Sequence, residues 1–259
     1  MSSLNAVWLK GSSGEKVVLF LHGFMGRAAE WMPIGRRLPL ASVALDLPGH
    51  GTSPVASDDW YDEALSGIDR FLRSEGQERV ILAGYSMGGR LAMHYAHRYP
   101  DKIEGLILES AHPGLTSKEE REERVALDRR WSNKIILDWP DVLEEWYNQP
   151  VFTSLSGSSL IEEIKNSRGW GDPESLSAAL SGFSTGLQAP FWEFLADFQV
   201  PVLFVSGAQD AKYCDVGARL DASSDKISHV VIPGAGHIVH QEQPEAYLGA
   251  LERFIARRF

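Results

Sequence analysis

The sequence predicts an α/β protein in which a mostly parallel sheet is flanked by helices and carries an inserted helical cap. Three observations favour this fold class. Short apolar runs alternate along the chain with longer segments of helical periodicity. These runs are apolar throughout, as strands that are covered on both faces require. One long segment in the middle of the chain is helical in pattern and poor in strands, which indicates an insertion.

The expected strands follow one another in a regular order. Val17–Leu21 is typical of a central strand, because every residue in the run is apolar. Similar runs predict strands at Ser42–Asp46, Val80–Ala83, Gly105–Leu108, Val202–Val205 and Val230–Ile232. Ala6–Lys10 is expected to add an edge strand. Apolar residues at helical spacing predict helices at 59–72, 88–97 and 244–259. Pro244 suits a helix start, where its missing N–H costs little.

The alternation of strands and helices stops after the strand that ends near Leu108 and resumes near Pro201. We therefore expect residues 113–195 to form the helical cap, and residues 1–112 and 196–259 to form the core domain. An insertion at this point would lie over the carboxyl ends of the strands, where open α/β sheets bind their ligands.

Composition excludes several classes of function. The formal net charge of −10 over 259 residues argues against nucleic acid as a partner. It leaves room for a small anionic substrate, because arginines gathered in a cleft can outweigh the global charge. Cys214 is the single cysteine, so no internal disulfide and no zinc-type spacing are expected. We expect no metal and no cofactor.

The N-terminal residues lack the basic and apolar regions of a signal peptide, and the longest apolar runs have only strand length. These features predict a cytoplasmic protein without a membrane span. They leave the oligomeric state open, with a monomer or a weak dimer as the expectation.

A candidate nucleophile lies in Gly84–Gly88, a Gly-x-Ser-x-Gly segment with Ser86 at its centre. The segment follows an apolar strand and precedes a helical pattern. This is the context in which such glycines permit the sharp turn that holds a serine above the sheet. A serine hydroxyl reacts poorly unless an imidazole takes its proton, so a histidine partner is needed.

The two partners are expected in loops that follow later strands. Asp210 comes after the strand Val202–Val205, and His237 follows a Gly-Ala-Gly turn after the strand near Val231. The order Ser, Asp, His is that of the α/β-hydrolase fold. We prefer His237 to His240, which would be displaced by about one helical turn. The sequence thus predicts a triad of Ser86, His237 and Asp210.

An oxyanion hole is expected beside the triad. A His-Gly-x loop after the first central strand can aim the backbone N–H of Phe24 at a developing negative charge, and Met87 can supply a second N–H. The same loop residues also shape the turn.

Several arginines are candidate anion ligands. Arg90 lies about one turn after Ser86, where it needs either a protein carboxylate or a substrate anion as a partner. The first cap helix offers Arg121, Arg124 and Arg129, and spacing does not choose among them. Arg168 is a further candidate in a later loop.

Five segments carry a resemblance to a known family. They are Gly84–Arg90, which contains the Gly-x-Ser-x-Gly segment, and His112–Leu115, Arg121–Arg124, Trp146–Phe152 and Ser184–Trp192. Together they resemble the 2-succinyl-6-hydroxy-2,4-cyclohexadiene-1-carboxylate synthases of menaquinone and phylloquinone biosynthesis, which have the α/β-hydrolase fold. The resemblance covers nearly the whole chain, and its cap motifs are more specific than the triad.

The resemblance implies a lyase that eliminates pyruvate from 2-succinyl-5-enolpyruvyl-6-hydroxy-3-cyclohexene-1-carboxylate, a small substrate with several carboxylates. It implies that Ser86, activated by His237, removes a ring proton, and that the oxyanion hole holds the dienolate. The remaining substrate-binding residues that it implies are Arg90, Arg124, Tyr85, Trp146 and, by a looser match, Arg168.

Two other functions are compatible with the triad. A carboxylesterase or carbon–carbon bond hydrolase would use the same residues, although it would have little use for Arg90 beside its serine. A ligand receptor without catalytic activity could also keep an intact triad, but the cap motifs disfavour it.

Overall fold

A computed structural model describes residues 3–56 and 59–258 of the chain. Within these residues seven strands form one sheet in the order β1-β3-β2-β4-β5-β6-β7. The strands are β1 (Ala6–Lys10), β2 (Val17–Leu21), β3 (Ala41–Leu45), β4 (Val80–Tyr85), β5 (Ile103–Glu109), β6 (Val202–Gly207) and β7 (Ile227–Ile232). β1 pairs antiparallel with β3, and the other neighbouring strands are parallel. The predicted α/β class is confirmed.

The interior strands separate two hydrophobic cores. Val17, Leu19 and Leu21 pack into the core on one face, whereas Val18 and Phe20 pack into the core on the other. The alternation follows from the strand geometry, in which successive side chains point to opposite faces. All five residues of β2 are completely buried, which accounts for the continuous apolar run.

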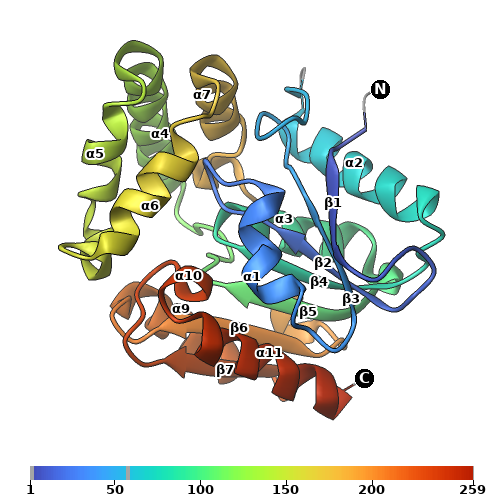
Figure 1. The fold of residues 1–259 in the computed structure, drawn as a ribbon. Coiled ribbons are helices and arrows are strands. Elements are labelled where there is room, and N and C mark those ends of the chain that lie inside the picture. Colours follow the sequence, from blue (N-terminus) through green and yellow to red (C-terminus); the bar gives the residue numbers. More distant parts are fainter. Residues whose placement is uncertain (1–2, 57–58, 259) are drawn as a thin grey trace.

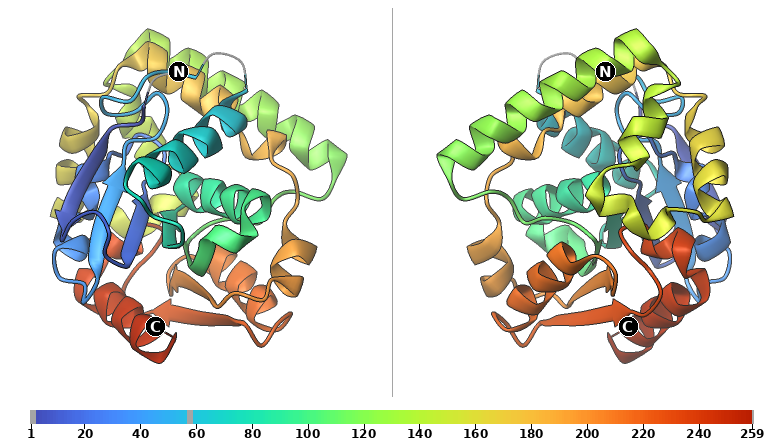
Figure 2. Two further views of the ribbon diagram at one scale, coloured as in Figure 1. Left: turned by 90° about the vertical axis from the view of Figure 1, so that its right-hand side faces the viewer. Right: turned by 90° about the vertical axis from the view of Figure 1, so that its left-hand side faces the viewer.

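Helices cover both faces (Figures 1 and 2). Residues of α2 (Trp60–Ser74), α3 (Met87–Arg98), α8 (Trp192–Asp197) and α9 (Ala211–Asp221) belong to the first core. Residues of α1 (Met32–Gly35), α10 (Val239–Glu242) and α11 (Pro244–Arg258) belong to the second. Two short 3-10 helices, η1 (Ala28–Trp31) and η2 (Pro100–Lys102), join these elements. Phe259, which ends the predicted last helix, lies outside the described residues.

The cap lies between β5 and β6 and forms a separate group of helices at one end of the molecule (Figure 1). It consists of α4 (Lys118–Asp138), α5 (Val142–Tyr147), η3 (Pro150–Leu155), α6 (Ser159–Arg168), α7 (Pro173–Gly182) and η4 (Thr185–Leu187). The boundary predicted at residues 195 and 196 falls inside α8, whose Leu195 packs in the first core.

The edge strand β7 begins at Ile227, three residues before the predicted start at Val230. Ser228 is exposed and His229 is half-buried, so this half of the strand lacks an apolar run. Among the helices of the described residues, none combines the length and the apolar character that crossing a membrane requires.

Candidate active site

Ser86 lies in a sharp turn between β4 and α3. Its backbone has φ 49° and ψ −108°, a conformation that costs a non-glycine residue about 1–3 kcal/mol. Two glycines make the turn possible. A Cβ at Gly84 would lie 2.5 Å from the carbonyl carbon of Gly88, and a Cβ at Gly88 would lie 2.3 Å from the Leu21 oxygen. The strand, the turn and the helix therefore hold the serine at the carboxyl end of the sheet.

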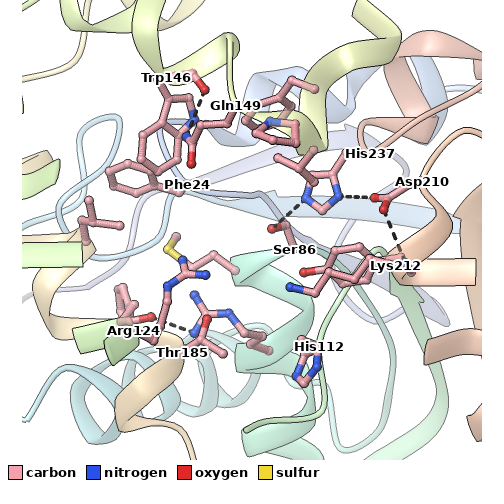
Figure 3. Close-up of a pocket in the computed structure, with 18 of the residues that line it drawn as sticks. Phe24, Ser86, His112, Arg124, Trp146, Gln149, Thr185, Asp210, Lys212 and His237 are labelled. Carbon is pink, nitrogen blue, oxygen red and sulfur yellow. Dashed lines mark hydrogen bonds and ion pairs between the residues drawn. The ribbon is translucent and has the colours of Figure 1, made fainter. Parts of the chain in front are cut away.

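The three predicted triad residues meet at this edge (Figure 3). Ser86 Oγ lies 3.4 Å from His237 Nε2, and His237 Nδ1 lies 2.7 Å from Asp210 Oδ2. Asp210 follows β6 and His237 follows β7, and both side chains are buried. The longer Ser86 distance is typical of a catalytic hydrogen bond that tightens when substrate binds. The arrangement can move a proton from the serine to the imidazole while the carboxylate stabilises the resulting charge.

His240 occupies a different environment from His237. Its Nδ1 lies 2.9 Å from the Glu109 carboxylate, and its ring stacks on Trp31 with centroids 4.3 Å apart. The buried Glu109 also accepts the backbone N–H of His240. The geometry thus places His237, and not His240, within reach of Ser86.

The loop that follows β2, His22–Gly26, contains the predicted oxyanion donor Phe24, and we call it the oxyanion loop. Neutral histidines fix its conformation. His22 Nδ1 lies 2.7 Å from the Gly23 oxygen, and the Met25 N–H donates to His50 Nε2 at 3.1 Å. Burial lowers the pKa of both His22 and His50 from 6.5 to about 3. His50 consequently stays uncharged and can accept the hydrogen bond. The network holds Phe24 in the wall of the cavity that contains Ser86 and Met87.

That cavity has a volume of about 530 Å³ and lies between the triad and the cap. Arg90, Arg124 and Lys212 contribute cationic side chains to its wall, whereas Asp210 is the acidic residue among those that line it in the described part of the chain. Asp210 already accepts a hydrogen bond from His237. The cavity is therefore positively charged inside a protein of net charge −10.

Arg90 is buried and its contacts leave its charge unneutralised. One terminal nitrogen donates to the Tyr61 hydroxyl at 2.9 Å and to the Phe183 carbonyl at 2.7 Å. Both acceptors are neutral oxygens, and no carboxylate in residues 3–56 and 59–258 forms an ion pair with this guanidinium. A buried cation without a carboxylate is costly unless an anion binds it. Of the two partners that the sequence leaves open for Arg90, the described residues thus supply no protein carboxylate, and a substrate anion is the alternative that remains.

Arg124 is the arginine of α4 that reaches the cavity. Its Nε lies 2.9 Å from both carboxylate oxygens of Asp128, which also accepts from Ser184 Oγ at 2.7 Å. Asp128 thereby orients the arginine. Arg121 and Arg129 instead border a shallow depression on a different surface of the cap.

Comparison with known proteins identifies the family. Residues 18–250 match the model of the alpha/beta hydrolase family. The chain is 34% identical to 2-succinyl-6-hydroxy-2,4-cyclohexadiene-1-carboxylate synthase of Serratia proteamaculans, over 95% of each chain. The chain belongs to this synthase family. It is also 34% identical to part of the chloroplastic protein PHYLLO of Arabidopsis thaliana, over 95% of this chain and 16% of PHYLLO.

The solved structure of MenH from S. aureus is similar to this chain over its whole length. It superposes with a TM-score of 0.91 at 25% identity, covering 100% of this chain and 99% of MenH. The resemblance, the α/β-hydrolase fold and the prediction of an enzyme are thus confirmed. The roles of individual site residues remain predictions in this member of the synthase family.

The two predicted aromatic residues lie in different places. Trp146 lines the cavity of this synthase-family chain and packs against Phe24 and Trp131, with ring centroids 5.2 and 5.1 Å away. Tyr85 is buried outside the set of residues that line the cavity. Its ring packs edge-on against the imidazole of His237, with ring centroids 5.5 Å apart, and so supports the catalytic histidine from outside the cavity.

Arg168 is expected from the synthase resemblance to bind substrate, but it lies apart from the cavity wall. It is buried at the end of α6, where one terminal nitrogen donates to the Phe24 carbonyl and the other lies 3.3 Å from Glu30 Oε2. In this structure the arginine therefore contacts the oxyanion loop, and its charge is paired within the protein.

Sequence reasoning missed other polar residues that line the cavity. They are His112, Gln149, Thr185, Gln209, Lys212 and Tyr213. Gln209, Lys212 and Tyr213 could have been found, because they lie within three residues of Asp210, which the sequence already assigns to the site. His112 follows β5 of the core sheet, whereas Gln149 and Thr185 lie in the cap, and only the docking of the cap brings these two to the serine.

Proposed function

We propose that this chain eliminates pyruvate from 2-succinyl-5-enolpyruvyl-6-hydroxy-3-cyclohexene-1-carboxylate and forms 2-succinyl-6-hydroxy-2,4-cyclohexadiene-1-carboxylate. The observation that carries the proposal is the combination of Ser86 with the cations Arg90 and Arg124 in one cavity. The substrate has three carboxylates. A positively charged cavity in an acidic protein is suited to such a ligand.

The proposed reaction begins with removal of a proton from the ring carbon that bears the succinyl group. Ser86 Oγ takes this proton while its own proton passes to His237 Nε2, and Asp210 stabilises the imidazolium. The electron pair of the broken C–H bond forms a new ring double bond, the existing double bond shifts, and the bond between the ring and the enolpyruvyl oxygen breaks. The enolpyruvate then gains a proton on carbon and becomes pyruvate. The reaction is redox-neutral and calls for no cofactor.

Negative charge develops on the succinyl ketone oxygen during proton removal. We propose that the backbone N–H groups of Phe24 and Met87 donate to this oxygen. One such donor typically contributes about 2.7–4 kcal/mol to transition-state stabilisation. Because Met87 begins α3, its N–H belongs to the first turn, which has no partner within the helix.

We propose that Arg90 and Arg124 bind substrate carboxylates and that Trp146 packs against the ring. Charge-assisted hydrogen bonds to a guanidinium fix both position and orientation, which favours proton removal from one carbon. We further propose that the protein works in the cytoplasm, as a monomer or a weak dimer.

The alternative is a carboxylesterase with the same triad. It is less consistent with Arg90, because a neutral ester offers nothing to neutralise a buried guanidinium about one turn from the serine. An esterase also needs a covalent acyl-serine, which the elimination does without.

The two functions are distinguished by supplying the enolpyruvyl substrate and following pyruvate release together with absorbance of the diene product. We expect both to appear together, with kcat/KM far above that for aryl esters. Rapid ester turnover without pyruvate or diene would refute the elimination and favour the esterase.

A further inference from the structure

Lys212 is a cation in the cavity wall and has no role in the reaction proposed above. It is the second residue of α9, two positions after the triad aspartate Asp210. Figure 3 shows Lys212 and Arg124 on opposite sides of Ser86 in that view, and the two come from different helices. Lys212 is exposed and lines the cavity. A ligand can therefore reach its ammonium group.

The ammonium group of Lys212 has no carboxylate partner in the described residues 3–56 and 59–258. Lys212 Nζ forms a cation–π contact with the ring of Tyr213, whose centroid lies 5.5 Å away. The surrounding protein and the nearby Arg124 lower the pKa of Lys212, while Asp210 and Glu120 raise it. An anion bound here would favour the charged lysine, because it would offset both desolvation and repulsion from the arginine.

A second cavity of about 510 Å³ adjoins the one that contains Ser86. The residues that line both cavities are His112, Arg124, Thr185, Lys212 and Tyr213. Lys212 thus lines both the cavity that contains Ser86 and the second cavity, whose wall also carries Glu120, Glu123 and Arg130.

We infer that Lys212 binds the carboxylate of the enolpyruvyl group, the part of the substrate that leaves as pyruvate. This inference rests on the proposed function. The substrate has three carboxylates, and the cavity offers three cations in Arg90, Arg124 and Lys212. Arg168, the other candidate, lies outside the cavity wall, whereas Arg124 lines the cavity although its Nε is paired with Asp128. Two cations then remain for the two carboxylates that the ring product keeps.

Substrate and product together provide a selective test, since only the substrate carries the enolpyruvyl carboxylate. Lys212→Met keeps the length of the side chain and removes its charge, whereas Lys212→Arg retains a cation. Lys226→Met is the matched control, because it removes a lysine from the loop between α9 and β7, outside both cavities.

We expect Lys212→Met to raise KM for the enolpyruvyl substrate roughly 10- to 100-fold, the worth of one hydrogen bond to a charged group. The inhibition constant of the diene product should change less than about 2-fold, because the lost contact is absent from the product. Lys212→Arg should recover most of the substrate affinity, and Lys226→Met should behave as wild type. Circular dichroism checks that each variant is folded.

An unchanged KM in folded Lys212→Met would overturn the inference, and so would an equal loss of substrate and product affinity. The second result would assign Lys212 to a carboxylate that the product retains. If the wild-type protein itself releases no pyruvate, the proposed function fails instead, so the two failures are distinguishable.

Discussion

Replacing Arg168 with methionine removes the contact that joins cap helix α6 to the oxyanion loop. Methionine keeps most of the aliphatic stem, so the change acts mainly on the guanidinium and its two acceptors. One acceptor is the carbonyl of Phe24, and the other is the carboxylate of Glu30 at 3.3 Å. The Arg168 side chain is 3% exposed and that of Glu30 is 8% exposed, so the pair is shielded from water.

The expected loss of stability follows from this burial. Removing one partner of a buried ion pair typically costs about 3–5 kcal/mol, because the other charge is left unpaired. For a chain of this size, that corresponds to a fall in Tm of roughly 6–20 °C. Arg168 also holds the Phe24 carbonyl by a hydrogen bond. Without this bond the backbone of Phe24 should shift, and the Phe24 N–H should no longer point at the developing negative charge. We expect kcat to fall about 10- to 100-fold, below the full value of an oxyanion donor, with KM changed less than about 3-fold.

Thermal unfolding and pyruvate-release kinetics measure the two effects separately. In the double variant Arg168→Met with Glu30→Gln, the unpaired charge is gone, so more than half of the lost stability should return. The low kcat should persist, because the Phe24 carbonyl still lacks its donor.

A different pattern would refute this interpretation of Arg168. If kcat stays at the wild-type value while KM rises more than about 10-fold, the arginine contacts substrate directly. If the double variant is no more stable than Arg168→Met, the ion pair is not the source of the stability.

Two further variants test the cavity and the helix α3 that follows Ser86. Arg124→Ala should reduce kcat/KM for pyruvate release about 10- to 100-fold while far-ultraviolet circular dichroism stays unchanged, and wild-type kinetics would remove Arg124 from the site. His94 is largely buried, which lowers its pKa from 6.5 to about 3. Below pH 6.5 the unfolded chain therefore binds a proton that the folded chain does not, and the free energy of unfolding falls as the pH falls. Urea unfolding should therefore show His94→Leu gaining about 2 kcal/mol relative to wild type between pH 7 and pH 5, and a pH-independent difference would contradict the assignment.

The features that the sequence predicts well are those encoded locally. The run Val17–Leu21 is apolar because both faces of β2 are buried, and the pattern needs no knowledge of its partners. The turn at Ser86 is equally local, since its glycines lie within two residues of the serine. For the edge strand β7 the sequence predicts only Val230–Ile232, because Ser228 interrupts the apolar run in the first half of the strand.

The features that sequence could not predict depend on how the cap meets the core. Arg121, Arg124 and Arg129 lie on one helix, and only the docking of α4 decides which of them reaches the cavity. Arg168 and Glu30 are 138 residues apart, so no spacing rule connects them. The contact nevertheless places the arginine against the oxyanion loop.

The central claim is that Ser86 removes a proton from the substrate ring. The most direct test compares single-turnover rates, with enzyme in excess, for substrate that carries hydrogen or deuterium on the ring carbon bearing the succinyl group. We expect slower diene formation from the deuterated substrate, release of one pyruvate per diene, and an unmodified Ser86 in the quenched enzyme. Equal rates for the two substrates, together with an acyl group on Ser86, would contradict it.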